Sequence, residues 1–279
     1  MRMNPSEALN MSAITAALRA PSRFAIDILD RCASTSTLLL DRAQEGAASG
    51  SVAVCEAQTA GRGRRGRAWL SAPEDSLTFS LLWRFPGGTP PLAGLSLAVG
   101  VAVVRALEAM GATGVGLKWP NDILAEGAKL GGILVETMTE SGRHVAVIGI
   151  GLNVRLPKRI AAALDMPAGA LSAVMPCAPS RNRLLAGLLD GLAAMLDEFT
   201  RAGFAAFIAE WRARNVYAGQ RVVILAEGAA PVEGRCAGVD SDGALLLETE
   251  HGLRRIVSGD VSLRLGDGPS PRPPPRGRG

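Results

Sequence analysis

The sequence predicts an α/β fold over most of the chain, followed by a small barrel of strands. Apolar residues alternate along several short segments and recur at helical spacing along longer ones, as far as Arg212. Beyond Gly219 only short strand-like runs separated by turns occur, which is typical of a small barrel. The chain has 279 residues and is 48% hydrophobic, so one large and one small domain can each bury a core.

Strands and helices alternate in the first half of the chain. Hydroxyl groups at 34–37 are suited to cap a helix, and a helix over 91–110 is expected to be opened by Pro91 and closed by Gly111. The turn at 141–142 predicts a hairpin whose two strands are central in the sheet. The strands predicted in this half are 23–29, 52–57, 77–85, 114–117, 131–138 and 144–152.

Two helices and then the barrel strands follow in the second half. Helical spacing of leucines predicts helices over 184–199 and 204–212 that cover one face of the sheet. The barrel strands are predicted at 221–225, 232–239, 244–248 and 253–257. The domain boundaries that we expect are an N-terminal extension at 1–20, a main domain at 21–218, the barrel at 219–266 and a disordered tail rich in proline and arginine at 267–279.

The composition excludes several classes of protein. Cys32, Cys55, Cys177 and Cys236 are scattered without a CxxC pair, so neither a disulfide framework nor a thiolate zinc site is indicated, and we expect reduced core cysteines. No basic-then-apolar leader begins the chain, and the longest apolar run, 92–104, is too short to cross a bilayer. We therefore expect a cytoplasmic protein with no membrane contact.

The net charge of +4 has a local origin. The segment 61–67 contributes four arginines and 269–279 three, and neither contains an acidic residue, so the remainder carries 4 − 7 = −3. This distribution argues against a broad nucleic-acid-binding face and for one anion site plus a charged tail.

The segment GRGRRGRAW at 61–69 formally matches GxGxxG and follows a strand. A dinucleotide-binding turn runs into a helix and needs an acidic residue about twenty positions later, whereas here loop and strand follow, and Trp83 and Arg84 occupy that distance. Arginines interleaved with glycines are better explained as a loop that wraps anions, because glycine admits close backbone approach and guanidinium groups bind carboxylate or phosphate in a bidentate manner. A solvated basic loop that binds RNA is the alternative.

Further motifs accompany this loop in a fixed order. Ser34-Thr35-Ser36 and Gln58 precede it, and LKWPNDIL (117–124), KLGGILVE (129–136) and IGIGLNV (148–154) follow. Over about residues 23–265, this combination resembles the bacterial biotin–protein ligases. The lipoate ligases share the architecture but not this set of motifs. The resemblance implies an α/β fold with a mixed sheet similar to the catalytic domains of class II aminoacyl-tRNA synthetases, followed by an SH3-like barrel.

The resemblance also implies an activity and a set of site residues. Biotin would be activated with ATP to biotinyl-5'-AMP and transferred to a lysine of a biotin carboxyl carrier protein of acetyl-CoA carboxylase. The implied catalytic residues are Lys129 and Arg64. The implied biotin-binding residues are Ser34, Thr35, Ser36, Gln58, Arg62, Gly63, Arg64, Lys129 and Gly132. The implied nucleotide-binding residues are Arg64, Lys129, Asn153, Gly149 and Gly151. Ser36 stands where the family usually has asparagine, so its reach is shorter.

The chemistry of the first step agrees with these assignments. A carboxylate must approach the α-phosphorus of ATP, so fixed cations are required, and Mg²⁺ is expected to neutralise the leaving pyrophosphate. Asp122 and Glu136 are candidate carboxylates near the metal, although both have a structural alternative. The second step needs no protein nucleophile, and His144 and His251 lie in no nucleophile motif. We expect 61–67 to be mobile without ligand and to order over the adenylate as a lid.

Some relatives carry an N-terminal winged helix and repress biotin synthesis. The stretch before Ser22 leaves no room for one, so the chain is expected to be the form without a DNA-binding domain. Two alternatives stay open: a lipoate or other acyl–protein ligase on the same fold, and a nucleic-acid-binding module that uses the arginine loop. Homodimer formation is also left open.

Overall fold

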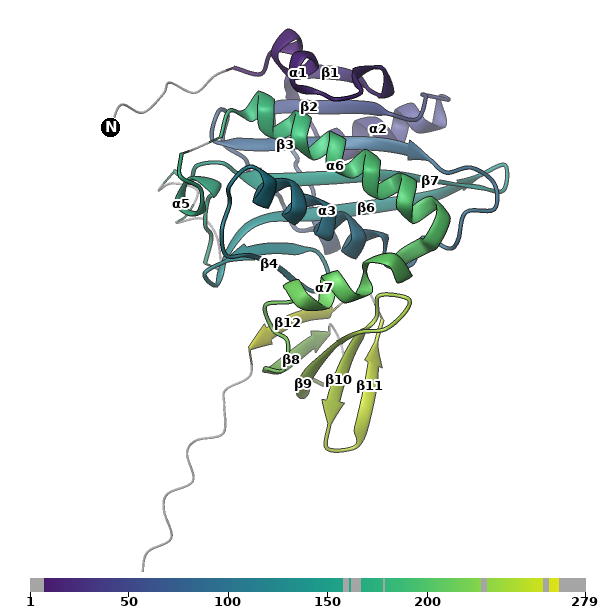
Figure 1. Ribbon diagram of the computed structural model, residues 1–279, viewed down its shortest axis with the longest axis vertical. Coiled ribbons are helices and arrows are strands. Elements are labelled where there is room, and N and C mark those ends of the chain that lie inside the picture. The colour runs from purple at the N-terminus through teal and green to yellow at the C-terminus, as the bar shows by residue number, and fades with distance from the viewer. Residues whose placement is uncertain are drawn as a thin grey trace, which may run out of the picture.

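The computed structural model describes residues 8–157, 161, 167–177, 179–226, 230–257 and 261–265. These residues form a seven-stranded mixed sheet and a separate five-stranded antiparallel sheet, which lies at one end of the molecule in Figure 1. The fold class expected from the sequence is therefore confirmed. The tail predicted to be disordered, 267–279, lies outside the described residues.

The large sheet has the strand order β1-β2-β3-β7-β6-β5-β4. β1 and β2 are parallel, and every other neighbouring pair is antiparallel. The hairpin β6–β7 is confirmed, with both strands in the interior of the sheet, and Ser141 and Gly142 take positive φ angles of 48° and 76° in its turn. The strands are β1 Ala25–Cys32, β2 Ser51–Gln58, β3 Ser76–Arg84, β4 Val115–Lys118, β5 Asp122–Ala125, β6 Ala128–Glu140 and β7 Arg143–Asn153.

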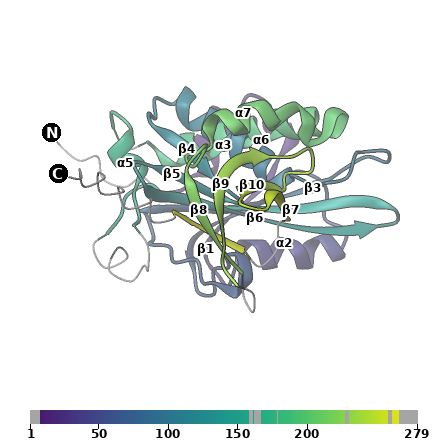
Figure 2. The same cartoon turned by 90° about the horizontal axis from the view of Figure 1, so that it is seen from below.

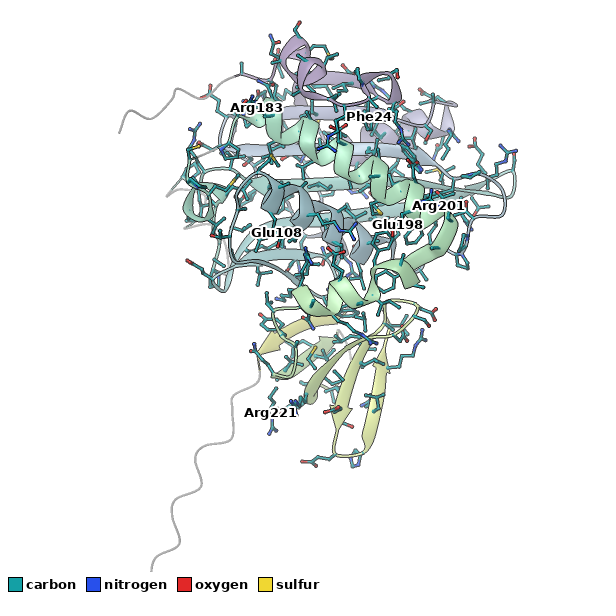
Figure 3. The ribbon with its side chains drawn as sticks, in the orientation of Figure 1. Phe24, Glu108, Arg183, Glu198, Arg201 and Arg221 are labelled. Carbon is teal, nitrogen blue, oxygen red and sulfur yellow. The ribbon has the colours of Figure 1, made fainter. Side chains whose placement is uncertain are left out.

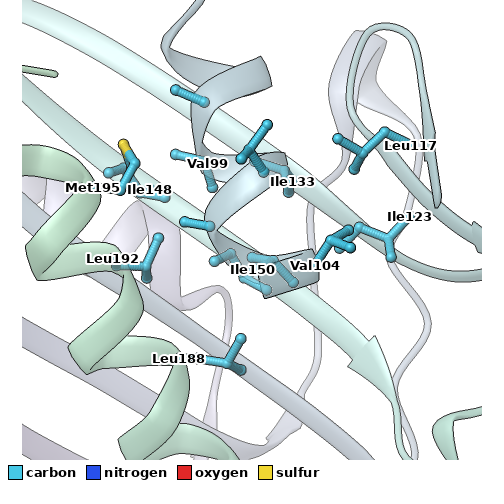
Figure 4. Packing of buried hydrophobic residues seen from close by; sticks show 14 of the residues in the cluster. Val99, Val104, Leu117, Ile123, Ile133, Ile148, Ile150, Leu188, Leu192 and Met195 are labelled. Carbon is cyan, nitrogen blue, oxygen red and sulfur yellow. The ribbon is translucent and has the colours of Figure 1, made fainter. Parts of the chain in front are cut away.

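Helices cover both faces of this sheet (Figures 1 and 2). α3 (Leu95–Ala109) and α6 (Arg181–Ala202) pack on one face, where Val99, Leu192 and Ile148 belong to the main core (Figure 4). α2 (Thr35–Gln44) covers part of the other face with a smaller apolar cluster. The outer side of α6 carries charged side chains such as Glu198 and Arg201 (Figure 3). The helices predicted at 34–37 onward and at 184–199 are confirmed.

The small sheet has the order β11-β10-β9-β8-β12 and stands where the barrel was predicted. It is tied to the main domain by the indole N–H of Trp119, which donates to the carbonyl of Gly243 at 3.0 Å. Its strands are β8 Arg221–Ala226, β9 Val232–Val239, β10 Leu245–Thr249, β11 Gly252–Ile256 and β12 Val261–Leu265. The remaining elements are α1 Met11–Ala17, α5 Leu171–Val174, α7 Ile208–Arg214 and the 3-10 turns Pro21–Arg23, Arg64–Gly66 and Gly203–Phe207.

Two sequence predictions about elements are corrected, and two strands were missed. α3 begins at Leu95 rather than Pro91, because Gly94 takes φ +76° and breaks the helical path; a Cβ there would lie 2.7 Å from Cβ of Phe204. The helix predicted at 204–212 is divided into a 3-10 turn and α7. The strands β5 and β12 were not predicted from the sequence.

The cysteine prediction is correct only in part. All four thiols are free, and Cys55 and Cys236 are buried. Cys32 is half-buried at the end of β1, and Cys177 is exposed in the turn after α5, so neither is a core residue. Within the described residues, no helix is long and apolar enough to span a membrane.

Candidate functional site

A cavity of about 620 Å³ lies among the N-terminal end of α2, the loop 61–70 and strands β3, β5, β6 and β7. Segments that are far apart in the sequence meet here. The structure brings every predicted site residue to this one cavity: Ser34, Thr35, Ser36, Gln58, Arg62, Gly63, Arg64, Lys129, Gly132, Gly149, Gly151 and Asn153 all line it.

One end of the cavity is neutral and rich in hydrogen-bonding groups. Ser34 caps α2 by accepting the N–H of Thr37 at 3.4 Å. Gln58 Oε1 accepts the backbone N–H of Thr35 at 2.8 Å and its hydroxyl at 3.2 Å, which fixes the amide plane of the glutamine. The helix start and the end of β2 are thereby locked together, so this end is preorganised before any ligand arrives.

Ser36 is directed toward the sheet. Its hydroxyl lies 3.0 Å from Ser80 Oγ, which also lies 2.8 Å from Thr35 Oγ1. A Cβ at position 149 would lie 2.5 Å from Ser36 Oγ, so any larger residue there would displace the Ser36 hydroxyl. The short side chain that replaces the usual asparagine is therefore packed between α2 and β7 and occupied by a protein partner.

The arginine–glycine loop closes on itself as a tight turn. Gly63 N–H donates to the carbonyl of Arg67 at 2.8 Å, and Trp69 N–H donates to the carbonyl of Gly61 at 2.9 Å. Arg65 at the tip takes φ 61°, a left-handed conformation that is strained for a residue with a side chain. All four arginines of the loop, Arg62, Arg64, Arg65 and Arg67, line the cavity; Arg64 is half-buried and the other three are exposed.

Trp69 lies against the floor of the cavity. A Cβ at Gly151 would lie 2.5 Å from Cζ2 of the indole, and a Cβ at the paired Gly132 would lie 3.6 Å from Cζ3. Close approach of the ring thus requires glycine at 151, whereas a Cβ at position 132 would make an ordinary van der Waals contact. Among the described residues, neither Trp69 Nε1 nor Thr78 Oγ1, both buried, has a hydrogen-bond partner.

The other end of the cavity is cationic. Lys129 Nζ lies 2.6 Å from Asp122 Oδ1, and Lys118 Nζ lies 4.0 Å from Asp122 Oδ2. Lys118 is 5% exposed, Asp122 13% and Lys129 23%, so these charges are poorly solvated. Two ammonium groups around one carboxylate leave a net positive charge at this end, which suits it to bind an anion.

A β-bulge directs Lys129 into the cavity. Asp122 pairs with Gly132, but Leu124 pairs with Lys129, so Leu130 is an extra residue in β6. Regular alternation from Gly132 would turn Lys129 to the opposite face. Asn153 supports this geometry, because its Nδ2 donates to the carbonyl of Gly169 at 3.1 Å and reaches that of Lys129 at 3.5 Å.

Lys118 was not among the sequence-predicted site residues, although it stands in the LKWPNDIL motif. In the sequence, only its spacing of four residues from Asp122 could have indicated a role for Lys118. The antiparallel pairing of β4 with β5 is what places Lys118 and Asp122 side by side. Tyr217 packs on the same ammonium, 5.8 Å from ring centroid to Nζ.

The carboxylates in and near the cavity determine how many protein ligands a metal ion could have there. Asp122 is the one acidic residue that lines the cavity within the described part of the chain, and Glu136 pairs with Arg62 instead. No group of three or more metal-ligating side chains occurs in that part of the chain. A divalent cation here would therefore have a single protein carboxylate.

Comparisons with known proteins agree with this geometry. Residues 28–153 match the model of the biotin/lipoate A/B protein ligase family, and residues 217–264 match that of the biotin protein ligase C terminal domain. The bifunctional ligase/repressor BirA of Escherichia coli is 34% identical over 93% of this chain and 79% of its own length. The biotin--[acetyl-CoA-carboxylase] ligase of Mycobacterium tuberculosis is 36% identical over 85% of this chain and 88% of its own. A solved structure of the biotin protein ligase from Aquifex aeolicus, in complex with biotin and ATP, has a TM-score of 0.73 at 31% identity and covers 86% of this chain and 99% of that one.

Proposed function

This chain belongs to the bacterial biotin–protein ligases, and we propose that its cavity activates biotin with ATP to biotinyl-5'-AMP and then transfers biotin to a lysine of a carrier protein. The chain is thus a ligase that releases AMP. The observation that carries the proposal is that one cavity has a neutral hydrogen-bonding end and a cationic end. The relatives from Mycobacterium tuberculosis and Paracoccus denitrificans are named as biotin--[acetyl-CoA-carboxylase] ligases, so the lipoate and nucleic-acid alternatives are not favoured.

The neutral end suits the ureido ring of biotin. Such a ring offers N–H donors and a carbonyl acceptor, which the hydroxyls of Ser34, Thr35 and Ser36 and the amide of Gln58 complement. These partners are already fixed by their own hydrogen bonds, so little entropy is lost when the ring binds. The biotin carboxylate would then extend toward Arg62, Gly63, Gly132 and the cationic end.

The cationic end suits the reacting anions. A biotin carboxylate oxygen attacks the α-phosphorus of ATP, the new O–P bond forms, and the bond to pyrophosphate breaks. Lys129 and Arg64 stabilise the charge that builds on the phosphoryl oxygens, and they are the catalytic residues of this proposal. Lys118 adds a second buried ammonium beside them. Two mutually repelling anions can approach because these cations are fixed in a poorly solvated pocket.

The nucleotide contacts proposed for Asn153, Gly149 and Gly151 act partly through packing. Asn153 holds the segment that carries Lys129, while the two glycines admit Ser36 and Trp69 to the cavity floor. Mg²⁺ fits this site as a companion of ATP, since the cation typically binds substrate phosphates with one or two protein carboxylates and Asp122 lines the cavity. When bound, it would supply charge neutralisation at the leaving pyrophosphate.

The second step uses the carrier's own nucleophile. The lysine amine of a biotin carboxyl carrier domain of acetyl-CoA carboxylase attacks the acyl carbon, and AMP leaves. The loop 61–67 excludes water from the adenylate meanwhile. We place this reaction in the cytoplasm, and neither step requires DNA or a second copy of the chain.

The direct test is modification of the carrier. Incubation of the full chain with biotin, MgATP and an apo-carrier domain should add one biotinyl group to one lysine, as measured by intact mass and peptide mapping. Biotin-dependent exchange of labelled pyrophosphate into ATP should report the first step alone. Exchange that depends on lipoate and not on biotin would replace this proposal with the lipoate ligase, and no exchange with either acid would reject both.

A further inference from the structure

Arg62 is held from behind by two side chains that do not line the cavity. Its Nη1 donates to Thr37 Oγ1 at 3.1 Å, and its Nη2 forms an ion pair with Glu136. Arg62 lines the cavity, whereas Thr37 and Glu136 are absent from its described lining. Arg62 therefore contributes to the cavity wall, while two of its guanidinium nitrogens are bound by residues outside that wall.

The two partners belong to rigid elements. Thr37 lies in the first turn of α2, directly after Ser36. Glu136 lies on β6 on the same face as Gly132, because strand residues separated by an even number share a face, and it pairs with Val147 beneath α2. Arg62 therefore bridges the first turn of α2 and strand β6 beside the cavity.

The carboxylate of Glu136 is committed to this arginine. The side chain is 25% exposed, and its Oε2 is buried without a hydrogen-bond partner among the described residues. The ion pair with the guanidinium offsets the loss of solvation of this carboxylate, so the charges of the pair cancel locally. Three of the five N–H donors of Arg62 remain for a ligand. Arg62 thus offers a ligand directed N–H groups rather than net positive charge.

We propose that Glu136 and Thr37 are positioning residues for biotin, which act by holding the Arg62 guanidinium at the biotin-binding end of the cavity. The inference rests on the proposed function. An arginine on a glycine-rich loop has many conformations, and ordering it on binding would cost affinity. Glu136 and Thr37 supply that order in advance. Because the contact is made to biotin before and during the reaction, its loss affects KM for biotin more than kcat.

The test is pyrophosphate exchange with Glu136→Gln, which keeps the size of the side chain and removes its charge. We expect KM for biotin to rise about tenfold, with kcat and KM for ATP changed less than about twofold. Glu140→Gln is the matched control, because Glu140 lies on the same strand and pairs with Arg84 outside the cavity; its kinetic constants should equal those of the wild type. Equal biotin KM values in Glu136→Gln and the wild type would overturn the proposal.

A double variant separates positioning from a general structural effect. If Glu136 acts through Arg62, then Glu136→Gln adds nothing to the biotin KM of Arg62→Ala. A further rise of several fold in that background would contradict the proposal. If a thermal unfolding scan shows that Glu136→Gln does not fold, Thr37→Val replaces it. Thr37→Val should raise the biotin KM, whereas Thr37→Ser, which keeps the hydroxyl, should not. Equal biotin KM values in these two variants would likewise reject the role. Wild-type chain without biotin-dependent exchange would instead reject the proposed function itself.

Discussion

Removal of the Lys129 charge is the most direct test of the cationic end. Lys129→Met keeps the length of the side chain and removes the ammonium that lies 2.6 Å from Asp122 Oδ1. In the reaction, this ammonium must be shared with the carboxylate and α-phosphate that approach each other. Its loss should therefore slow adenylation more than it weakens the binding of either substrate.

The expected size follows from the environment of the lysine. Two unit charges about 4 Å apart interact by about 4 kcal/mol at an effective dielectric constant of about 20. Lys129 is 23% exposed, and only charge that develops in the transition state counts, so we expect a loss of about 1.4–4 kcal/mol, or about tenfold to a thousandfold in kcat/KM. Asp122 also loses its closest partner and then repels the anions. Lys129→Met combined with Asp122→Asn should consequently recover part of the rate.

Biotin-dependent pyrophosphate exchange measures this effect. Lys129→Arg is the matched control, because it keeps the positive charge and should retain more activity than Lys129→Met. Thermal unfolding should show that both variants fold. A kcat/KM for Lys129→Met within about threefold of the wild type, which is under about 0.7 kcal/mol, would refute the electrostatic role of this lysine.

Three further predictions concern the cavity floor, acid stability and the loop. Gly151→Ala places a Cβ against the indole of Trp69 and should lower the free energy of unfolding, measured with denaturant, by about 1–3 kcal/mol. Gly191→Ala within α6 is the control and should be neutral or stabilising. Equal stability of both variants would contradict the packing. Desolvation raises the pKa of Glu56, but the hydrogen bond and ion pair with the buried Arg181 at 2.6 Å, together with the backbone N–H groups of Leu9 and Glu74, outweigh it and leave this pKa lowered. The stabilisation from Glu56 is present above the unfolded-state pKa and is lost as pH falls through the lower folded-state pKa. Glu56→Gln should therefore flatten the acid limb of a stability–pH curve, and an unchanged limb would remove this group from the acid response. Trypsin should cut the free chain after the arginines of 61–67 and be blocked there by biotin with ATP; identical cleavage at saturation would count against the lid.

Local sequence was sufficient for much of the framework. The hairpin turn at 141–142 needs residues that accept positive φ, and the hydroxyl of Ser34 caps α2 within its own first turn, so both features depend on near neighbours alone. The motif residues could be assigned to one site because the resemblance supplied their association. Their contacts and orientations could not be derived in this way.

Other features depend on partners that are distant along the chain. Phe204 packs so closely on Gly94, the residue before α3, that a Cβ there would clash with it, a contact that no local pattern encodes. Glu136 and Arg62 are 74 residues apart, and their pairing exists only because α2, β6 and the loop meet. Sequence reasoning therefore left Glu136 as a candidate near the metal, whereas the structure pairs it with the loop arginine.

Lys129 shows most clearly which features of the site the sequence alone does not predict. Its identity and its place in KLGGILVE indicated a cation for the reacting acids. Strict strand alternation, however, would turn it away from the face that carries Gly132. Only the pairing of β5 with β6, which leaves Leu130 as a bulge, brings the ammonium beside Asp122. Residue chemistry determined what this protein can bind, and long-range strand pairing decided which side chains meet to bind it, because register is set by the whole sheet rather than by any one strand.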